Sequence, residues 1–185
     1  GEYISAHVRA RYPAFESPMN KSKSYLVDKV GGHFEWEGDV REYMIKLSDN
    51  AINCAHLLSP DLPVFFVSDS HHLSNFWNST EIKKIGDNVD VPVLAVNRSI
   101  EPPHIDRDDG WPGSKPYDFF TVFEDILIMG GSKCVAHGIG SFGSLGSALI
   151  GNKCSVVHRN PKGGSNMCPN QSSERALIPT DPKVK

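Results

Sequence analysis

Residues 133–146 read KCVAHGIGSFGSLG, and this stretch decides the fold. Its apolar start predicts a buried strand, its glycines and serines predict a tight turn, and its end predicts the start of a helix. Backbone N–H groups at the start of a helix bind anions. We therefore expect a strand–turn–helix unit that can bind a phosphate.

The chain opens on a second informative stretch, YISAHVR, at residues 3–9. This apolar run predicts a strand over residues 2–9, and it ends on the basic residues His7 and Arg9. Ligands of open α/β sheets bind at the carboxyl ends of the strands. Because the Gly/Ser turn also follows a strand, Arg9 and the turn can meet at that edge. A guanidinium and backbone amides would then hold a diphosphate between them.

Strands and helices alternate along the rest of the chain. Apolar patterns predict further strands at residues 64–67, 91–96, 135–136 and 155–158, and helices at residues 39–58, about 73–85, 117–129 and 141–150. This alternation is typical of the α/β class, a doubly wound, Rossmann-like parallel sheet with helices on both faces. We expect residues 1–158 to form one α/β domain and residues 159–185 to form a tail or crossing segment.

The composition is that of a globular protein. Of the 185 residues, 39% are hydrophobic and 22% are charged. The net charge of −3 includes no basic excess, so we expect no nucleic-acid partner. No apolar run approaches the roughly 18 residues that span a membrane. The chain begins at Gly1 without an initiator methionine or signal peptide, so we expect a piece of a longer protein, with any anchor outside it.

Four N-x-S/T sequons lie in polar stretches, at Asn20, Asn78, Asn97 and Asn170. Chance would give about one in a chain of this length and composition. Their number favours glycosylation at these asparagines, and therefore a secretory-pathway lumen. The alternative is that Asn, Ser and Thr are simply common in loops.

The four cysteines allow three pairings, among which the sequence does not choose. Cys134 and Cys154 fall on or beside predicted strands, where they can be plain buried thiols. Cys168 lies in a Gly/Pro/Asn-rich tail, which a disulfide would hold in place. A bridge from Cys168 to Cys154 or Cys54 would fit an oxidising lumen.

Three pieces of the chain, in this order, resemble the C-terminal, donor-binding half of GT-B fucosyltransferases. The sequence His7-Val8-Arg9 resembles their H-x-R motif. Residues 63–70, PVFFVSDS, resemble their apolar strand with an acidic loop, and Gly138 to Leu145 resembles their strand–turn–helix. The family comprises the α1,6-, plant-type and protein O-fucosyltransferases and their bacterial relatives, and the resemblance covers about residues 1–158. Ala10 departs from the pattern, because many members have a second arginine there.

The resemblance implies a GDP-sugar donor, GDP-fucose, and inverting transfer of the sugar to a glycan or glycoprotein acceptor. It implies an N-terminal acceptor domain outside this chain, and a place in the Golgi or endoplasmic reticulum. Arg9 would be the catalytic residue, because it would stabilise the leaving diphosphate without a metal cofactor. The implied donor-binding residues are His7, Arg9, Asp69, Gly140, Ser141, Phe142, Gly143 and Ser144.

Each of these residues has a simpler interpretation. Arg9 could form a surface ion pair, His7 could be a core residue, and Asp69 could be an Asx turn or the N-cap of a helix. The G-x-G-x-x-G spacing from Gly138 to Gly143 also occurs in dinucleotide folds, but there it follows the first strand. The chain has no C-x-x-C, H-x-x-x-H or H-E-x-x-H motif, so we expect no metal site.

The alternative hypothesis for the whole chain is a non-catalytic nucleotide- or glycan-binding module. Such a module would keep the glycosyltransferase fold while its active site has decayed.

Overall fold

A computed structural model describes residues 2–10, 38–80, 82–85, 89–99, 102, 115–138, 140–151, 154–158 and 168. The strands are β1 (Ile4–Val8), β2 (Val64–Ser68), β3 (Ile82–Ile85), β4 (Val89–Ala95), β5 (Val135–His137) and β6 (Ser155–Val157). The helices are α1 (Gly38–Leu58), α2 (His71–Asn78), α3 (Phe120–Gly131) and α4 (Ser141–Leu149). A 3-10 turn at Pro116–Phe119 leads into α3.

The strands form one six-stranded sheet in the order β3-β4-β2-β1-β5-β6. Every pairing is parallel except that of β3 with β4. From β1 the chain adds β2 and β4 on one side, and then returns to add β5 and β6 on the other. This order of parallel strands is that of doubly wound nucleotide-binding sheets. The predicted α/β, Rossmann-like fold is therefore confirmed. The order in which the chain adds strands reverses between β1 and β5.

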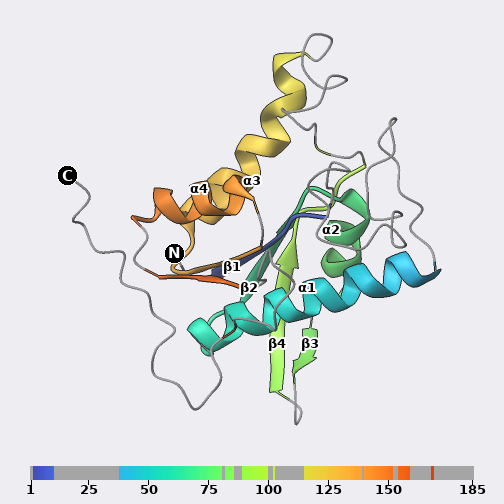
Figure 1. The fold of residues 1–185 in the computed structure, drawn as a ribbon, viewed down its shortest axis with the longest axis vertical. Coiled ribbons are helices and arrows are strands. Elements are labelled where there is room, and N and C mark those ends of the chain that lie inside the picture. The colour runs from blue at the N-terminus through green and yellow to red at the C-terminus, as the bar shows by residue number, and fades with distance from the viewer. Residues whose placement is uncertain are drawn as a thin grey trace.

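Helices cover both faces of the sheet, with α1 on one side and α3 and α4 on the other (Figure 1). Side chains of β1 alternate between the two faces. Ile4, Ala6 and Val8 join the main apolar cluster together with residues of α1 and α2. Ser5 faces the opposite side, where its hydroxyl donates to the carbonyl of Ile128 in α3 at 3.5 Å.

The predicted helix over residues 73–85 is wrong in its second half. Helix α2 ends at Asn78, and the residues of β3 pair antiparallel with β4. Lys83 of β3 is buried, and its Nζ lies 2.7 Å from Asp49 and 3.1 Å from Asn53, both on α1. These contacts with β4 and α1 are tertiary, so the local apolar pattern did not reveal the strand.

Two disulfides join the four cysteines, Cys54–Cys168 and Cys134–Cys154. The interpretation of Cys134 and Cys154 as plain buried thiols is therefore wrong. Each directly precedes one of two paired strands, β5 and β6, and parallel pairing brings their Cα atoms within 4.7 Å. For Cys168, the structure selects Cys54 from the two partners that the sequence left open.

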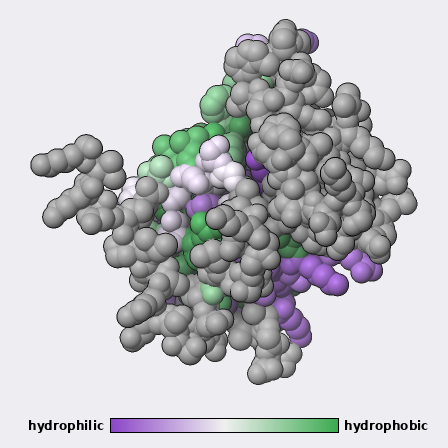
Figure 2. Space-filling model, in the orientation of Figure 1, coloured by the Kyte–Doolittle hydropathy of each residue, from purple (hydrophilic) through white to green (hydrophobic). Residues whose placement is uncertain are grey.

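The outer surface of α3 and α4 is unusually apolar (Figure 2). Its exposed large side chains are Phe120, Phe123, Leu127, Leu145 and Leu149. A groove runs beside α3, and its lining includes Tyr3, which precedes β1. The groove therefore reaches the amino end of β1, whereas ligands of such sheets bind at the carboxyl ends.

Among the described residues, the structure contains no helix of the length and apolar character that crossing a membrane requires.

Candidate functional site

The candidate site is the edge of the sheet at the carboxyl ends of β1 and β5, where the strand order reverses. Doubly wound sheets bind ligands in a crevice at this point, and we refer to this edge as the crevice. The predicted residues Arg9 and Gly140 meet there. A Cβ atom on Gly140 would lie 3.2 Å from Nη1 and 3.3 Å from Cδ of Arg9. The arginine side chain therefore lies directly against the backbone of the Gly/Ser turn, in the arrangement expected from the sequence.

The turn gives way to α4 in a conformation that favours glycine. Gly140 is the N-cap of α4, with φ of 104°, and it makes no side-chain cap hydrogen bond. Residues other than glycine rarely adopt this backbone conformation, because their Cβ atom clashes with the backbone. Ser141 and Ser144 are exposed on the first turn of α4. The first-turn N–H groups thus have no capping side chain from Gly140, and Arg9 lies beside them.

Gly143 brings α4 down onto the sheet. A Cβ atom at this position would lie 2.5 Å from Cβ of His137 and 2.9 Å from Nδ1 of His7. The register pairs His7 with His137 across β1 and β5, so the two imidazoles lie side by side under α4. Phe142 is half-buried, and its ring centroid is 5.5 Å from that of His7.

His7 supports the floor of the crevice. Its Nδ1 is buried and has no hydrogen-bond partner in the described part of the chain. The pKa of His7 is lowered to about 3, mainly by burial. The Asp69 carboxylate acts in the opposite direction, and His158, His137 and Arg9 contribute to the lowering. The ring is therefore neutral at neutral pH. Because Nδ1 faces Gly143, this nitrogen contacts the helix rather than a ligand.

Sequence reasoning missed His137, the last residue of β5. It is buried, and its Nδ1 lies 3.2 Å from the carbonyl oxygen of Gly138. Burial lowers the pKa of His137, and its contact with Gly138 acts in the opposite direction. The signal was present in the sequence, because His137 directly precedes the Gly/Ser turn. Like His7 before Arg9, it stands near the end of a strand whose following residues were predicted to bind the ligand.

Asp69 fixes the backbone beside Arg9. Its Oδ1 accepts a hydrogen bond of 2.6 Å from the N–H of Ala10. Asp69 is not the cap of α2, because Ser70 fills that position and its hydroxyl accepts from Leu73 N–H. The N-cap interpretation of Asp69 is therefore wrong. Ala10 is 2% exposed and belongs to the main apolar cluster, so it leaves no open space for a second arginine.

A buried ion pair near the same edge was also missed. Arg98, just after β4, is 6% exposed, and its guanidinium donates to both carboxylate oxygens of Asp125 in α3. Its Nη2 also lies 3.3 Å from Glu124. The side chain of Asn75 in α2 holds the Arg98 backbone through two hydrogen bonds of 2.6 and 2.7 Å. The acidic pair Glu124-Asp125 within the largely apolar helix of residues 117–129 was the available signal.

The Arg98–Asp125 pair is ionic at neutral pH. Burial raises the pKa of Asp125 to about 6, and the Arg98 guanidinium opposes that rise. Burial also opposes the charge of Arg98, but its bonds to Asp125 and Glu124 outweigh this effect and raise its pKa. The charge of Asp69 contributes to the raised pKa of Asp125, so the pair and the crevice are electrostatically connected.

Two of the four predicted glycosylation sites are described. Asn78, the last residue of α2, and Asn97, two residues after β4, are both exposed. Asn20 and Asn170 lie outside the described residues. Within the described ranges, no three His, Cys, Asp or Glu side chains are placed to hold a metal ion.

No protein-family model, curated protein or solved structure matches this chain. A guanidinium beside a helix start is suited to an anion, because both present N–H donors to the same point.

Replacing Gly143 by alanine should destabilise the fold. The new Cβ would overlap His137 and His7, so Gly143→Ala should lower the free energy of unfolding by about 1–3 kcal/mol. The exposed Ser144→Ala is the matched control and should stay within about 0.5 kcal/mol of wild type. Chemical denaturation measures both. Wild-type stability in Gly143→Ala would contradict the close approach of α4 to the sheet.

The neutral His7 should make folding sensitive to acid. Its pKa is about 6.5 in the unfolded chain but about 3 when folded. The contribution of neutral His7 to the free energy of unfolding is therefore fully present above pH 6.5. It is lost as the pH falls below that value, because His7 then binds a proton in the unfolded chain but not in the folded one. Between pH 7 and pH 5, wild type should lose about 2 kcal/mol more stability than His7→Gln.

Denaturation curves of both proteins at the two pH values test this expectation. The comparison cancels Asp125, whose raised pKa acts in the opposite direction in both proteins. Identical pH dependence in wild type and His7→Gln would show that His7 does not carry this effect.

Proposed function

We propose that this chain binds a nucleotide sugar, GDP-fucose, and is the donor-binding half of a fucosyltransferase-like glycosyltransferase. The observation that carries the proposal is the contact of Arg9 with the Gly140 backbone where the strand order reverses. This position is where doubly wound sheets bind nucleotides. The H-x-R resemblance supplies the identity of the donor.

The proposed reaction is an inverting displacement at the anomeric carbon of the sugar. An acceptor hydroxyl oxygen forms the new bond, and the bond from that carbon to the diphosphate oxygen breaks. The departing diphosphate gains negative charge in the transition state. Arg9 and the first-turn amides of α4 would stabilise that charge in a fixed geometry, so a metal ion is not required. The acceptor's proton would pass to a base of the acceptor or of the second domain.

Asp69 supports nucleoside recognition in this proposal. It is half-buried at the carboxyl end of β2, next to the strand that carries Arg9. Its Oδ1 accepts a hydrogen bond from the Ala10 N–H, which holds the carboxylate at this edge. In the proposal, the carboxylate would accept from a ribose hydroxyl or from a base of the bound nucleotide.

The disulfides support a secretory-pathway lumen. Cys54–Cys168 and Cys134–Cys154 would form and persist in an oxidising compartment. The exposed positions of Asn78 and Asn97 are compatible with glycan attachment. A glycosyltransferase that acts on glycans or glycoproteins would meet its acceptor in the same compartment.

A non-catalytic nucleotide- or glycan-binding module remains the second candidate, and the buried Ala10 favours it. The family's second arginine is absent from this position, and the alanine belongs to the apolar core. Titration of GDP and UDP distinguishes the two candidates, because a catalytic relative should prefer GDP.

Replacing Arg9 should weaken GDP binding. Arg9→Ala should cost about 1.5–3 kcal/mol, the range for a hydrogen bond to a charged group. Arg9→Lys should restore only part of this, because an ammonium does not form the bidentate fork. Calorimetry measures the affinities, and Lys84→Ala on the distant edge strand β3 is the control for loss of a surface charge. Unchanged affinity in Arg9→Ala, with the parent binding GDP, would remove the main support for the proposed function.

The compartment can be tested by expression in a eukaryotic secretory host. Asn78 and Asn97 should both carry glycan, since both are exposed members of N-x-S/T sequons. Endoglycosidase should lower the mass of the wild type, and Asn78→Gln and Asn97→Gln should each remove one glycan. An unmodified protein with four reduced thiols would count against a luminal compartment.

A further inference from the structure

His158, the residue directly after β6, lies at the back of the crevice. His158 is 1% exposed, and Nε2 of its ring is 2.8 Å from the carbonyl oxygen of His7. A carbonyl oxygen only accepts, so Nε2 carries the proton and donates this hydrogen bond. The same oxygen accepts from the N–H of Gly138 at 3.2 Å. The His7 carbonyl oxygen, near the end of β1, therefore accepts hydrogen bonds from both His158 and the start of the turn.

The ring of His158 also fills the space beside Gly138. A Cβ atom on Gly138 would lie 3.2 Å from both Cε1 and Nε2 of the ring. This is closer than ordinary van der Waals contact, so the ring packs directly on the backbone where the turn begins. One side chain thus contacts both halves of the crevice, the strand that leads to Arg9 and the turn that leads to Gly140.

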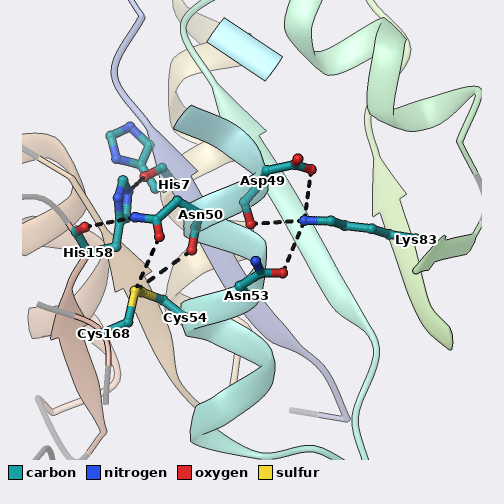
Figure 3. The surroundings of a disulfide bond; sticks show 8 residues. All are labelled: His7, Asp49, Asn50, Asn53, Cys54, Lys83, His158 and Cys168. Carbon is teal, nitrogen blue, oxygen red and sulfur yellow. Dashed lines mark hydrogen bonds and ion pairs between the residues drawn. A yellow bond between two sulfur atoms is a disulfide. The ribbon is translucent and has the colours of Figure 1, made fainter. Parts of the chain in front are cut away.

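The backbone of His158 is held from two sides, and Figure 3 shows one of them, the contact with Asn50. Asn50 of α1 donates from Nδ2 to the His158 carbonyl at 3.1 Å, and the His158 N–H donates to the carbonyl of His137 at 2.9 Å. Oδ1 of Asn50 is 3.6 Å from Sγ of Cys168, whose disulfide partner Cys54 is also on α1. The imidazole therefore acts on the crevice from a fixed position.

We propose that His158 is a positioning residue of the crevice, which sets the separation between Arg9 and the Gly138–Ser141 turn and thereby the affinity for a diphosphate. The ring is buried, so it acts through the His7 carbonyl and the Gly138 backbone rather than by touching the ligand. The identity of the ligand rests on the proposed function, whereas the bracing itself does not require any ligand.

Three substitutions separate the hydrogen bond from the volume of the ring. His158→Gln keeps an amide donor at the place of Nε2, whereas His158→Asn places its amide near Nδ1 and does not reach His7. Calorimetry with GDP should give roughly 3- to 10-fold weaker binding for His158→Ala and His158→Asn, the equivalent of one net hydrogen bond. His158→Gln should bind GDP within about 2-fold of wild type.

A double-mutant cycle distinguishes positioning from general destabilisation. If His158 acts through Arg9, His158→Ala should have little further effect on GDP affinity in the Arg9→Ala background. The matched control is His56→Ala, another buried histidine, in the last turn of α1. It should lower stability and leave GDP affinity unchanged. Equal losses of affinity from His158→Ala in both backgrounds would overturn the positioning role.

Hydrogen exchange tests the same inference without any ligand. Amides of residues 4–10 and 138–145 should exchange several-fold faster in His158→Asn than in His158→Gln, with other segments unchanged. If wild type binds no GDP while this difference appears, the proposed function fails and the positioning role stands. If the Asn and Gln variants match in both exchange and GDP affinity, the positioning role is wrong. This pair decides the question even if His158→Ala does not fold.

Discussion

Strand β1 is buried along its whole length, and the positions of the other elements depend on that burial. All its residues, Ile4–Val8, are buried, and it pairs in parallel with β2 on one edge and β5 on the other. Parallel neighbours require crossover connections, which place helices on both faces of the sheet. The chain adds strands first on one side of β1 and then on the other, and the helices that follow β1 and β5, α1 and α4, lie on opposite faces of the sheet. The crevice that holds Arg9 is therefore a consequence of the strand order.

Two glycines then determine how closely α4 approaches the rest of the structure. Gly143 faces the histidines of β1 and β5, and Gly146 faces Met129 of α3, where a Cβ atom would lie only 2.6 Å away from the Met129 Cβ. Ser141 and Ser144 lie on the other side of the helix and are exposed. Glycine within a helix is less favourable than alanine by about 1 kcal/mol, and close packing offsets this. The start of α4 consequently lies beside Arg9.

The sequence was informative where local pattern and structure coincide. The alternation of apolar runs predicted the parallel sheet, and the Gly/Ser turn and Arg9 were correctly expected to meet at one edge. The Cys134–Cys154 disulfide, the strand at Ile82–Ile85 and the Arg98–Asp125 pair were missed. Each depends on which strands become neighbours, and residues far apart in the chain carry no local sign of that. His137 was the exception, since its position before the turn was visible in the sequence.

The carboxyl edge of the sheet is held together by side chains that follow the strands. Asp69 after β2 accepts from the N–H of Ala10 after β1. Arg98 after β4 donates to the last carbonyl of β2 at 3.4 Å, and His158 after β6 donates to a carbonyl of β1. Backbone pairing stops at the strand ends, so loops there would otherwise separate freely. Side chains from three strands therefore continue the hydrogen bonding past the strand ends. A crevice whose two sides are held at a fixed distance loses less conformational entropy when it binds an anion, and this pre-organisation raises affinity.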